Sequence, residues 1–299
     1  MLTIESLGLG TGELLALTAA ITWGIGTFIF GFINKKISSF NVTFLSTLPL
    51  LPLQIIVIFL IGDLSELYIF DLKILAIIST VTILTYVIGG TLYITSIKNA
   101  GVSIAASVTS IEPLYTFIFA LFFLGEVITP IIILGTISII AGISLLNIQK
   151  NGDETKRKNV RKGIIYAIIV AGLWAIGPVM LIPVFKHVSV FYVNMFRVAI
   201  QTIVMGTILI SQKNFLSSFK MKTRDAVPIF LGGGLTGYVA VILFLTSIQT
   251  IGVSIATPIS CTYPLFAFVL AMVFLKEEIT RFKLIGIIAI VSGTILLTL

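Results

Sequence analysis

The chain has 299 residues, of which 58% are hydrophobic and only 10% are charged, and its mean hydropathy is +1.17. A soluble globular protein has roughly 25% charged residues, so the composition excludes a water-soluble fold. The net charge of +7 does not indicate a nucleic-acid partner, because the basic residues lie in short gaps between apolar runs and form no continuous basic face.

In chain order, ten apolar runs are long enough to cross a hydrocarbon core, which needs about 20 residues of helix. The first run follows a segment without Lys or Arg, so it lacks the basic region of a cleavable signal peptide and is predicted to be a permanent span. The predicted spans are 12–33, 40–62, 72–95, 101–124, 130–148, 163–184, 189–211, 226–248, 252–275 and 282–298.

The longest polar segment, residues 149–162, is predicted to be a basic cytoplasmic linker between two five-helix repeats, residues 1–148 and 163–299. Basic residues are concentrated in this linker and in the other loops that follow odd-numbered spans. Cytoplasmic loops carry an excess of Lys and Arg. We therefore expect a multi-pass protein of the cell membrane, inner or plasma, with its basic loops in the cytoplasm and both termini outside.

The two parts of the chain are related by an offset of 151 residues. The sequence Gly-Val-Ser-Ile-Ala at 101–105 recurs at 252–256, and the same offset pairs Trp23 with Trp174. Five spans is an odd number, so the second copy must enter the membrane from the face where the first copy ends. The fold class is therefore predicted to be an all-α membrane protein with two inverted five-helix repeats, an architecture typical of secondary transporters.

Several short motifs recur in the same order in both halves. They are Trp23-Gly24 and Trp174 with Gly177, Glu112-Pro113-Leu114 and Tyr263-Pro264-Leu265, Phe-Leu-Gly-Glu at 123–126 and Phe-Leu-Lys-Glu at 274–277, and the glycines 135, 142, 286 and 293. With these motifs the sequence resembles the drug/metabolite transporter superfamily, specifically its EamA-type ten-helix transporters. The resemblance covers nearly the whole chain and implies efflux or exchange of small metabolites such as amino acids, nucleobases or sugars.

Glu112 lies near the middle of the fourth predicted span, where an ionisable group is costly unless it is paired, hydrated or protonated. It is the candidate for proton coupling and for substrate binding, and the alternative is a permanently neutral acid bonded to a neighbouring helix. Thr109 and Tyr115 lie three residues away and are predicted to share its helical face. Tyr263 is the equivalent of Glu112 in the second half, so both should face one central site.

Five further residues complete the candidate substrate site. Tyr86 and Tyr93 lie on a polar stripe of the third span, and interhelical packing is the alternative use of such a stripe. Trp23 and Trp174 could stack on an organic substrate or could fix helix packing. Arg197 could bind a substrate carboxylate, although snorkelling to the outer interface or helix anchoring is the favoured interpretation. The resembled family often has an arginine in the second helix of each half, and the first-half equivalent here is Ser46.

An enzyme is not predicted, because the chain contains neither His-Glu-x-x-His nor Gly-x-Ser-x-Gly and has one histidine. We predict a secondary transporter, with amino acids or related compounds as the leading substrate class and proton coupling as a hypothesis. A multidrug, sugar or nucleobase carrier is the alternative, and a channel is less favoured. The expected partners are a small-molecule substrate and the lipid bilayer, with no nucleic acid, cofactor or metal, and two fused halves favour function as a monomer.

Overall fold

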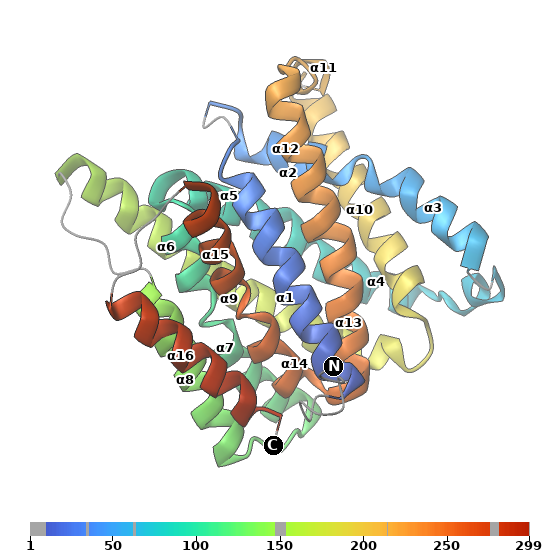
Figure 1. Cartoon of the computed structure of the whole chain (residues 1–299). Helices are drawn as coiled ribbons and strands as arrows, with labels where there is room; N and C mark the ends of the chain where they lie inside the picture. Colours follow the sequence, from blue (N-terminus) through green and yellow to red (C-terminus); the bar gives the residue numbers. More distant parts are fainter. Residues whose placement is uncertain are drawn as a thin grey trace.

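The computed structural model describes residues 10–33, 36–61, 64–146, 154–213, 215–275 and 281–298, and this part of the chain is helical without a β-strand (Figure 1). Its α-helices are α1 (Thr11–Phe30), α2 (Ser39–Thr47), α3 (Leu50–Ile61), α4 (Leu72–Val81), α5 (Gly90–Ala100), α6 (Val102–Thr109), α7 (Glu112–Phe119), α8 (Pro130–Leu146), α9 (Glu154–Phe185), α10 (Val190–Ser211), α11 (Phe215–Ser218), α12 (Thr223–Gly234), α13 (Ala240–Ile251), α14 (Val253–Ser260), α15 (Tyr263–Leu275) and α16 (Arg281–Leu296). A 3₁₀ turn, η2 (Leu64–Ile69), and three π-helical segments, η3 (Thr82–Gly89), η4 (Ala120–Leu124) and η5 (Leu235–Val239), connect some of them.

Within the described ranges, 8 helical stretches are long and apolar enough to cross a membrane. They are Thr11–Phe30, Ser39–Leu60, Leu72–Ala100, Ile104–Leu124, Asn159–Phe185, Val190–Ser211, Thr223–Ile251 and Val253–Phe274. The two remaining predicted spans correspond to α8 and α16, which are shorter at 17 and 16 residues. The structure thus confirms an all-helical chain with multiple candidate spans, while ten spans in two inverted halves remain a proposal.

The start of α9 differs from the sequence prediction. The helix begins at Glu154, inside the predicted linker 149–162, and continues without a break into the sixth predicted span. Glu, Lys and Arg are good helix formers, so the polar segment extends the helix. Residues 149–153 lie outside the described part.

The second predicted span is not one continuous helix. Helix α2 ends at Thr47 and α3 begins at Leu50, with Pro49 between them. Proline has no N–H to donate and its ring clashes with the preceding turn, so the chain changes direction here. Helix α3 then extends along α10, against which it packs (Figure 1).

The fourth and ninth predicted spans are also interrupted, and at equivalent positions. Helix α6 gives way to α7 at residues 110–111, and α14 gives way to α15 at residues 261–262. Pro113 and Pro264 each follow the first residue of the new helix, where a missing N–H is tolerated. The same prolines withdraw the hydrogen bonds that the carbonyls of Thr109 and Ser260 would accept in a continuous helix.

Helices α8 and α16 pack against each other and lie side by side at the lower left of Figure 1. A Cβ atom on Gly142 would lie 2.6 Å from the carbonyl oxygen of Gly286, and a Cβ on Gly135 would lie 2.9 Å from that of Gly293. Glycine therefore permits this backbone approach. Since the earlier residue of one helix meets the later residue of the other, the two helices are antiparallel.

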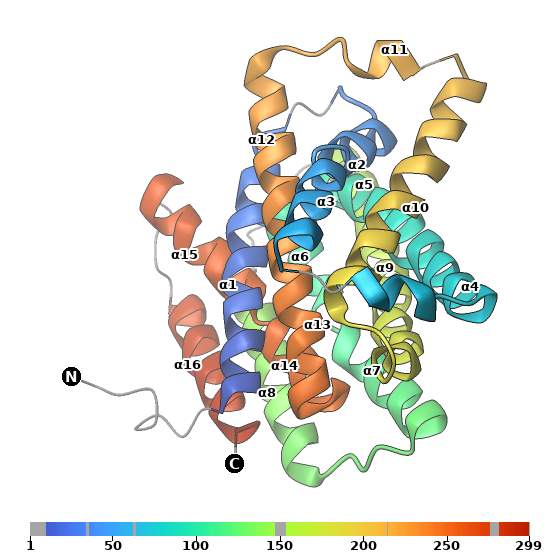
Figure 2. The same ribbon diagram turned by 90° about the vertical axis from the view of Figure 1, so that its right-hand side faces the viewer.

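The first helix of each part of the chain packs on the other part. Helix α1 contacts α12, α13, α14 and α15, whereas α9 contacts α4, α5, α6 and α7. Figure 2 shows the same arrangement from the side, with α1 against α13. The predicted halves therefore interlock, and the residues between them come from both.

Candidate functional site

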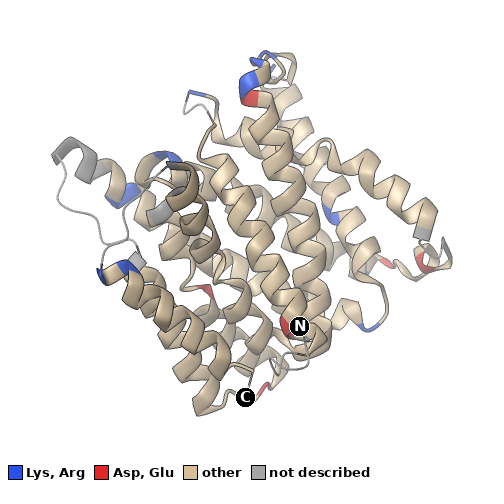
Figure 3. Cartoon of the chain, in the orientation of Figure 1, with Lys and Arg blue, Asp and Glu red and all other residues tan. Residues whose placement is uncertain are grey.

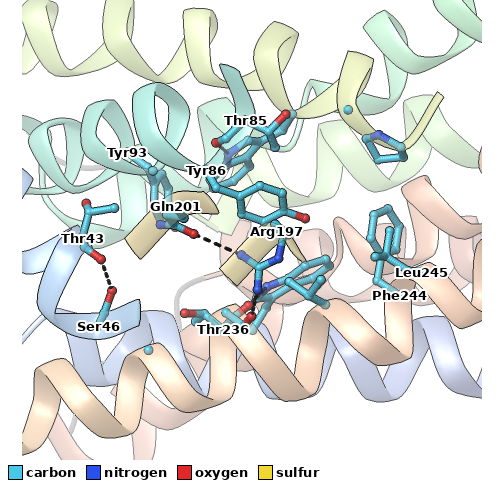
Figure 4. Close-up of a pocket in the computed structure, with 18 of the residues that line it drawn as sticks. Thr43, Ser46, Thr85, Tyr86, Tyr93, Arg197, Gln201, Thr236, Phe244 and Leu245 are labelled. Carbon is cyan, nitrogen blue, oxygen red and sulfur yellow. Dashed lines mark hydrogen bonds between the residues drawn. The ribbon is translucent and has the colours of Figure 1, made fainter. Parts of the chain in front are cut away.

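A cavity of about 160 Å³ lies between helices of the two halves and is lined from both of them (Figure 4). A cavity of roughly 150 Å³ can hold benzene, so this one has room for a small organic molecule. Seven of the nine predicted site residues line it, namely Trp23, Tyr86, Tyr93, Glu112, Trp174, Arg197 and Tyr263.

Arg197 lies inside the cavity wall and is only 2% exposed. Its Nε donates to Asn194 Oδ1 at 2.7 Å, its Nη1 to Gln201 Oε1 at 3.2 Å, and its Nη2 to the carbonyl of Gly237. The guanidinium carbon also lies 4.2 Å from the ring centroid of Tyr86. Arg197 therefore does not snorkel to the membrane interface, because polar groups of α10 and η5 bind the guanidinium inside the protein. Its bond to the carbonyl of Gly237 agrees with the alternative of helix anchoring.

The described residues do not provide an acceptor for every hydrogen-bond donor of the Arg197 guanidinium. A guanidinium has five N–H donors, and the three hydrogen bonds above use three of them. All three acceptors are neutral, and no carboxylate of the described residues is paired with it. A buried charge normally has a counter-charge, so an anionic group in the cavity would complete the bonding of this side chain.

Glu112 is the first residue of α7 and is buried at the break between α6 and α7. Its Oε2 lies 3.8 Å from the thiol sulfur of Cys261, a weak donor from the equivalent break in the second half. The amino end of α7 favours negative charge at this position. No basic side chain among the described residues pairs with Glu112, although Arg197 lines the same cavity.

Tyr263 connects helices from both halves through its hydroxyl group. The hydroxyl lies 2.6 Å from Thr109 Oγ1 and 3.4 Å from the hydroxyl of Tyr93. Thr109 therefore lies behind Tyr263 and does not line the cavity, and Tyr115 is partly exposed elsewhere. The helix break at 110–111 separates Thr109 from Glu112, so the predicted common face does not extend to Thr109. Tyr115 follows Glu112 by three residues within α7 but does not line the cavity.

The two tryptophans make matching hydrogen bonds across the halves. Trp23 Nε1 donates to the carbonyl of Thr236 at 3.0 Å, and Trp174 Nε1 donates to the carbonyl of Thr85 at 3.1 Å. Both acceptors belong to π-helical segments, which are frequent at functional sites. Donors and acceptors are each 151 residues apart, so the two bonds are equivalent under the sequence repeat.

The amides around Arg197 were not among the residues predicted from the sequence. Asn194 and Gln201 lie three residues before and four residues after Arg197, a helical spacing that could have revealed them. Gln54, which reaches the same network from α3, offered no such local signal because it comes from a distant part of the chain. In the described residues there is no group of three His, Cys, Asp or Glu side chains that could hold a metal.

Together these features define a helical membrane protein with a small internal cavity whose wall contains one buried cation and one buried acid. Comparison with known proteins specifies the class. The sequence matches the EamA-like transporter family twice, over residues 10–148 and 161–299, and the chain belongs to this family. The family resemblance inferred from the motifs is thus confirmed.

Two individual proteins are similar along nearly their whole length. An "Uncharacterized transporter" of Archaeoglobus fulgidus is 26% identical over 291 residues, which cover 96% of this chain and 97% of the relative. A protein of known crystal structure is 18% identical, covers 95% of each chain and superposes with a TM-score of 0.71. The second similarity shows that the fold is shared.

Proposed function

We propose that this protein is a secondary transporter that exports or exchanges small metabolites, with amino acids or related compounds as the leading substrate class. The observation that supports this class best is Arg197, a buried cation in the cavity wall whose acceptors in the described part of the chain are all neutral and leave two of its donors without a partner there. A guanidinium matches the geometry of a carboxylate and can bind it through two parallel hydrogen bonds.

The second charged group of the cavity supports a zwitterionic substrate. Glu112 has no basic partner among the described contacts and could accept a bond from a substrate ammonium group. The aromatic and aliphatic lining, which includes Trp23, Trp174 and Phe244, would contact an apolar side chain. This apolar lining also favours the second candidate, a carrier of amphipathic drug-like compounds, while sugars and nucleobases match the cavity less well.

The proposed mechanism is alternating access by two inverted halves, residues 1–148 and 163–299, joined by the linker 149–162. Three observations support it: the antiparallel contact of α8 with α16, the equivalent tryptophan bonds and the double family match. Inverted repeats place the substrate at the repeat interface and move around it. With both halves in one chain, the transporter would function as a monomer.

The proposed orientation places the basic loops in the cytoplasm. Figure 3 shows most of the blue Lys and Arg positions toward the upper helix ends, whereas α1 begins and α16 ends in the lower part of the view. Cytoplasmic loops are enriched in basic residues. Both termini would then lie outside the cell membrane.

Counterflow in liposomes tests this function. Vesicles preloaded with unlabelled L-leucine should accumulate radiolabelled L-leucine transiently, with an initial rate that saturates as the L-leucine concentration rises. In parallel, further vesicles are preloaded with one amino acid from each of the remaining classes. Flux that rises linearly with concentration would contradict a carrier and favour a channel. A panel in which drug-like cations but no amino acids exchange would favour the second candidate.

Proton coupling through Glu112 is a separate part of the proposal. Protonation would remove the cost of a buried charge during the transition between states. Glu112→Gln should therefore abolish acceleration of transport by an imposed pH gradient. Counterflow, which needs no gradient, should continue with a raised KM, because the substrate ammonium group loses its carboxylate partner. If the variant responds to the gradient like the original protein, Glu112 is not the coupling group.

A further inference from the structure

Gln54 is a fully buried amide on α3, the short helix that follows the break at Pro49. Its neighbours Leu53 and Ile55 are 41% and 43% exposed on the outer surface of α3, where lipid would surround them. Helix α3 packs on α10, the helix of Arg197. Gln54 therefore contacts α10, in the second half of the chain, from α3 in the first half.

The amide of Gln54 forms two hydrogen bonds with α10. Its Nε2 donates to the carbonyl of Phe191 at 3.0 Å, and its Oε1 accepts from Asn194 Nδ2 at 2.9 Å. Asn194 then presents Oδ1 to Arg197 Nε at 2.7 Å. Together these three bonds form a continuous chain from a backbone carbonyl of α10 to the guanidinium.

Only one orientation of the two side-chain amides allows all three hydrogen bonds. The carbonyl of Phe191 can only accept, so Gln54 must direct its NH₂ group toward it and its oxygen toward Asn194. Asn194 must then direct its own NH₂ group toward Gln54 and its oxygen toward Arg197. Without Gln54, Asn194 could turn its NH₂ group toward Arg197 Nε, where a donor would face a donor.

We propose that Gln54 is a positioning residue that fixes Asn194 and thereby orients the guanidinium of Arg197 toward the substrate. The inference rests on the proposed function, since it assigns Arg197 to a substrate carboxylate. It also predicts selectivity. The loss of Gln54 should weaken the binding of compounds that have a carboxylate and should leave the binding of their neutral amides unchanged. Because Gln54 comes from α3, the orientation of Arg197 depends on the contact between the two halves.

The positioning can be tested without any substrate. In protein labelled with ¹⁵N-arginine, the Nε–H signal of Arg197 is assigned by its loss in Arg197→Lys. Gln54→Met, which preserves length and removes both hydrogen bonds, should shift this signal and accelerate its exchange with solvent by about tenfold, as expected for one lost hydrogen bond. Leu53→Met, on the outer side of α3, is the matched control and should leave the signal unchanged.

A second variant separates positioning from packing. Gln54→Glu, in its protonated form, retains an acceptor for Asn194 Nδ2 and an O–H donor for the carbonyl of Phe191, and should leave the Arg197 signal close to that of the original protein. Equal behaviour of the Met and Glu variants would show that packing, and not orientation of Asn194, is responsible, and would overturn the proposal. An unchanged Arg197 signal in Gln54→Met would overturn it as well.

Binding of L-leucine and L-leucinamide, measured by calorimetry, tests the consequence for recognition. Gln54→Met should lower the affinity for L-leucine by about tenfold and leave the affinity for L-leucinamide unchanged. If Arg197→Lys weakens the binding of L-leucine while Gln54→Met does not, the role of Gln54 is overturned and the proposed function stands. If Arg197→Lys binds L-leucine normally, or the original protein does not bind it, the substrate assignment of Arg197 fails, and the arginine signal alone decides whether Gln54 positions it.

Discussion

Replacing Arg197 with lysine removes the planar fork of donors and retains the positive charge. The guanidinium holds Asn194, Gln201 and the carbonyl of Gly237 at once, and two of its five donors have no partner among the residues that the structure describes. An ammonium group has three donors in total. It can therefore serve the protein acceptors or the substrate carboxylate, but not all of them in the same geometry.

The size of the effect follows from the bonds lost. A hydrogen bond to a charged group contributes about 1.5–3 kcal/mol, and about 1.4 kcal/mol corresponds to tenfold in affinity. Loss of one substrate bond in Arg197→Lys should therefore raise the KM for L-leucine counterflow about 10-fold to 150-fold. The exposed Arg224, replaced in the same way, is the control for the loss of a guanidinium. A KM in Arg197→Lys equal to that of the original protein would refute carboxylate recognition by Arg197.

Three further predictions concern packing, a helix end and the cavity. Gly142→Ala should lower the thermal unfolding temperature, because overpacking costs about 1–3 kcal/mol, whereas Gly172→Ala, whose Cβ would meet nothing within 4 Å, should not; equal melting would show that α8 and α16 adjust freely. Glu126→Gln should cost about 0.3–1 kcal/mol of stability, since it removes the negative charge that faces the first amides of α14, and an unchanged melting temperature would show that this charge is dispensable. Cys261, the only cysteine and a cavity residue, should react with N-ethylmaleimide several-fold more slowly when L-leucine is bound, and a ligand-independent rate would place the ligand elsewhere.

The hydrophobic pattern and the repeat predicted much of the architecture. Apolar runs of membrane length, separated by short polar gaps, define helices because a spanning chain must satisfy its backbone groups internally. The offset of 151 residues brought Glu112 and Tyr263 together as candidates, and both line the cavity. These predictions succeeded because they depend on properties that lie within one segment or repeat between two.

The errors arose where a tertiary contact decides the outcome. Depth along a span suggested that Arg197 reaches the interface, but the acceptors that hold it come from η5 and from its own helix face. Regular spacing grouped Thr109 with Glu112, although a helix break separates them. Gln54 was not recognised because its partners are 137 and 140 residues away, and no local pattern indicates such a contact.

The two breaks at 110–111 and 261–262 have a consequence for the diversification of this architecture. At the breaks the carbonyls of Thr109 and Ser260 lack the N–H that Pro113 and Pro264 cannot supply, and a main-chain carbonyl cannot be removed by substitution. Each break is flanked by a side chain of the cavity wall, Glu112 in one half and Tyr263 in the other. Cargo preference can therefore change by exchange of a few such side chains while the backbone framework, and the movement it permits, stays the same.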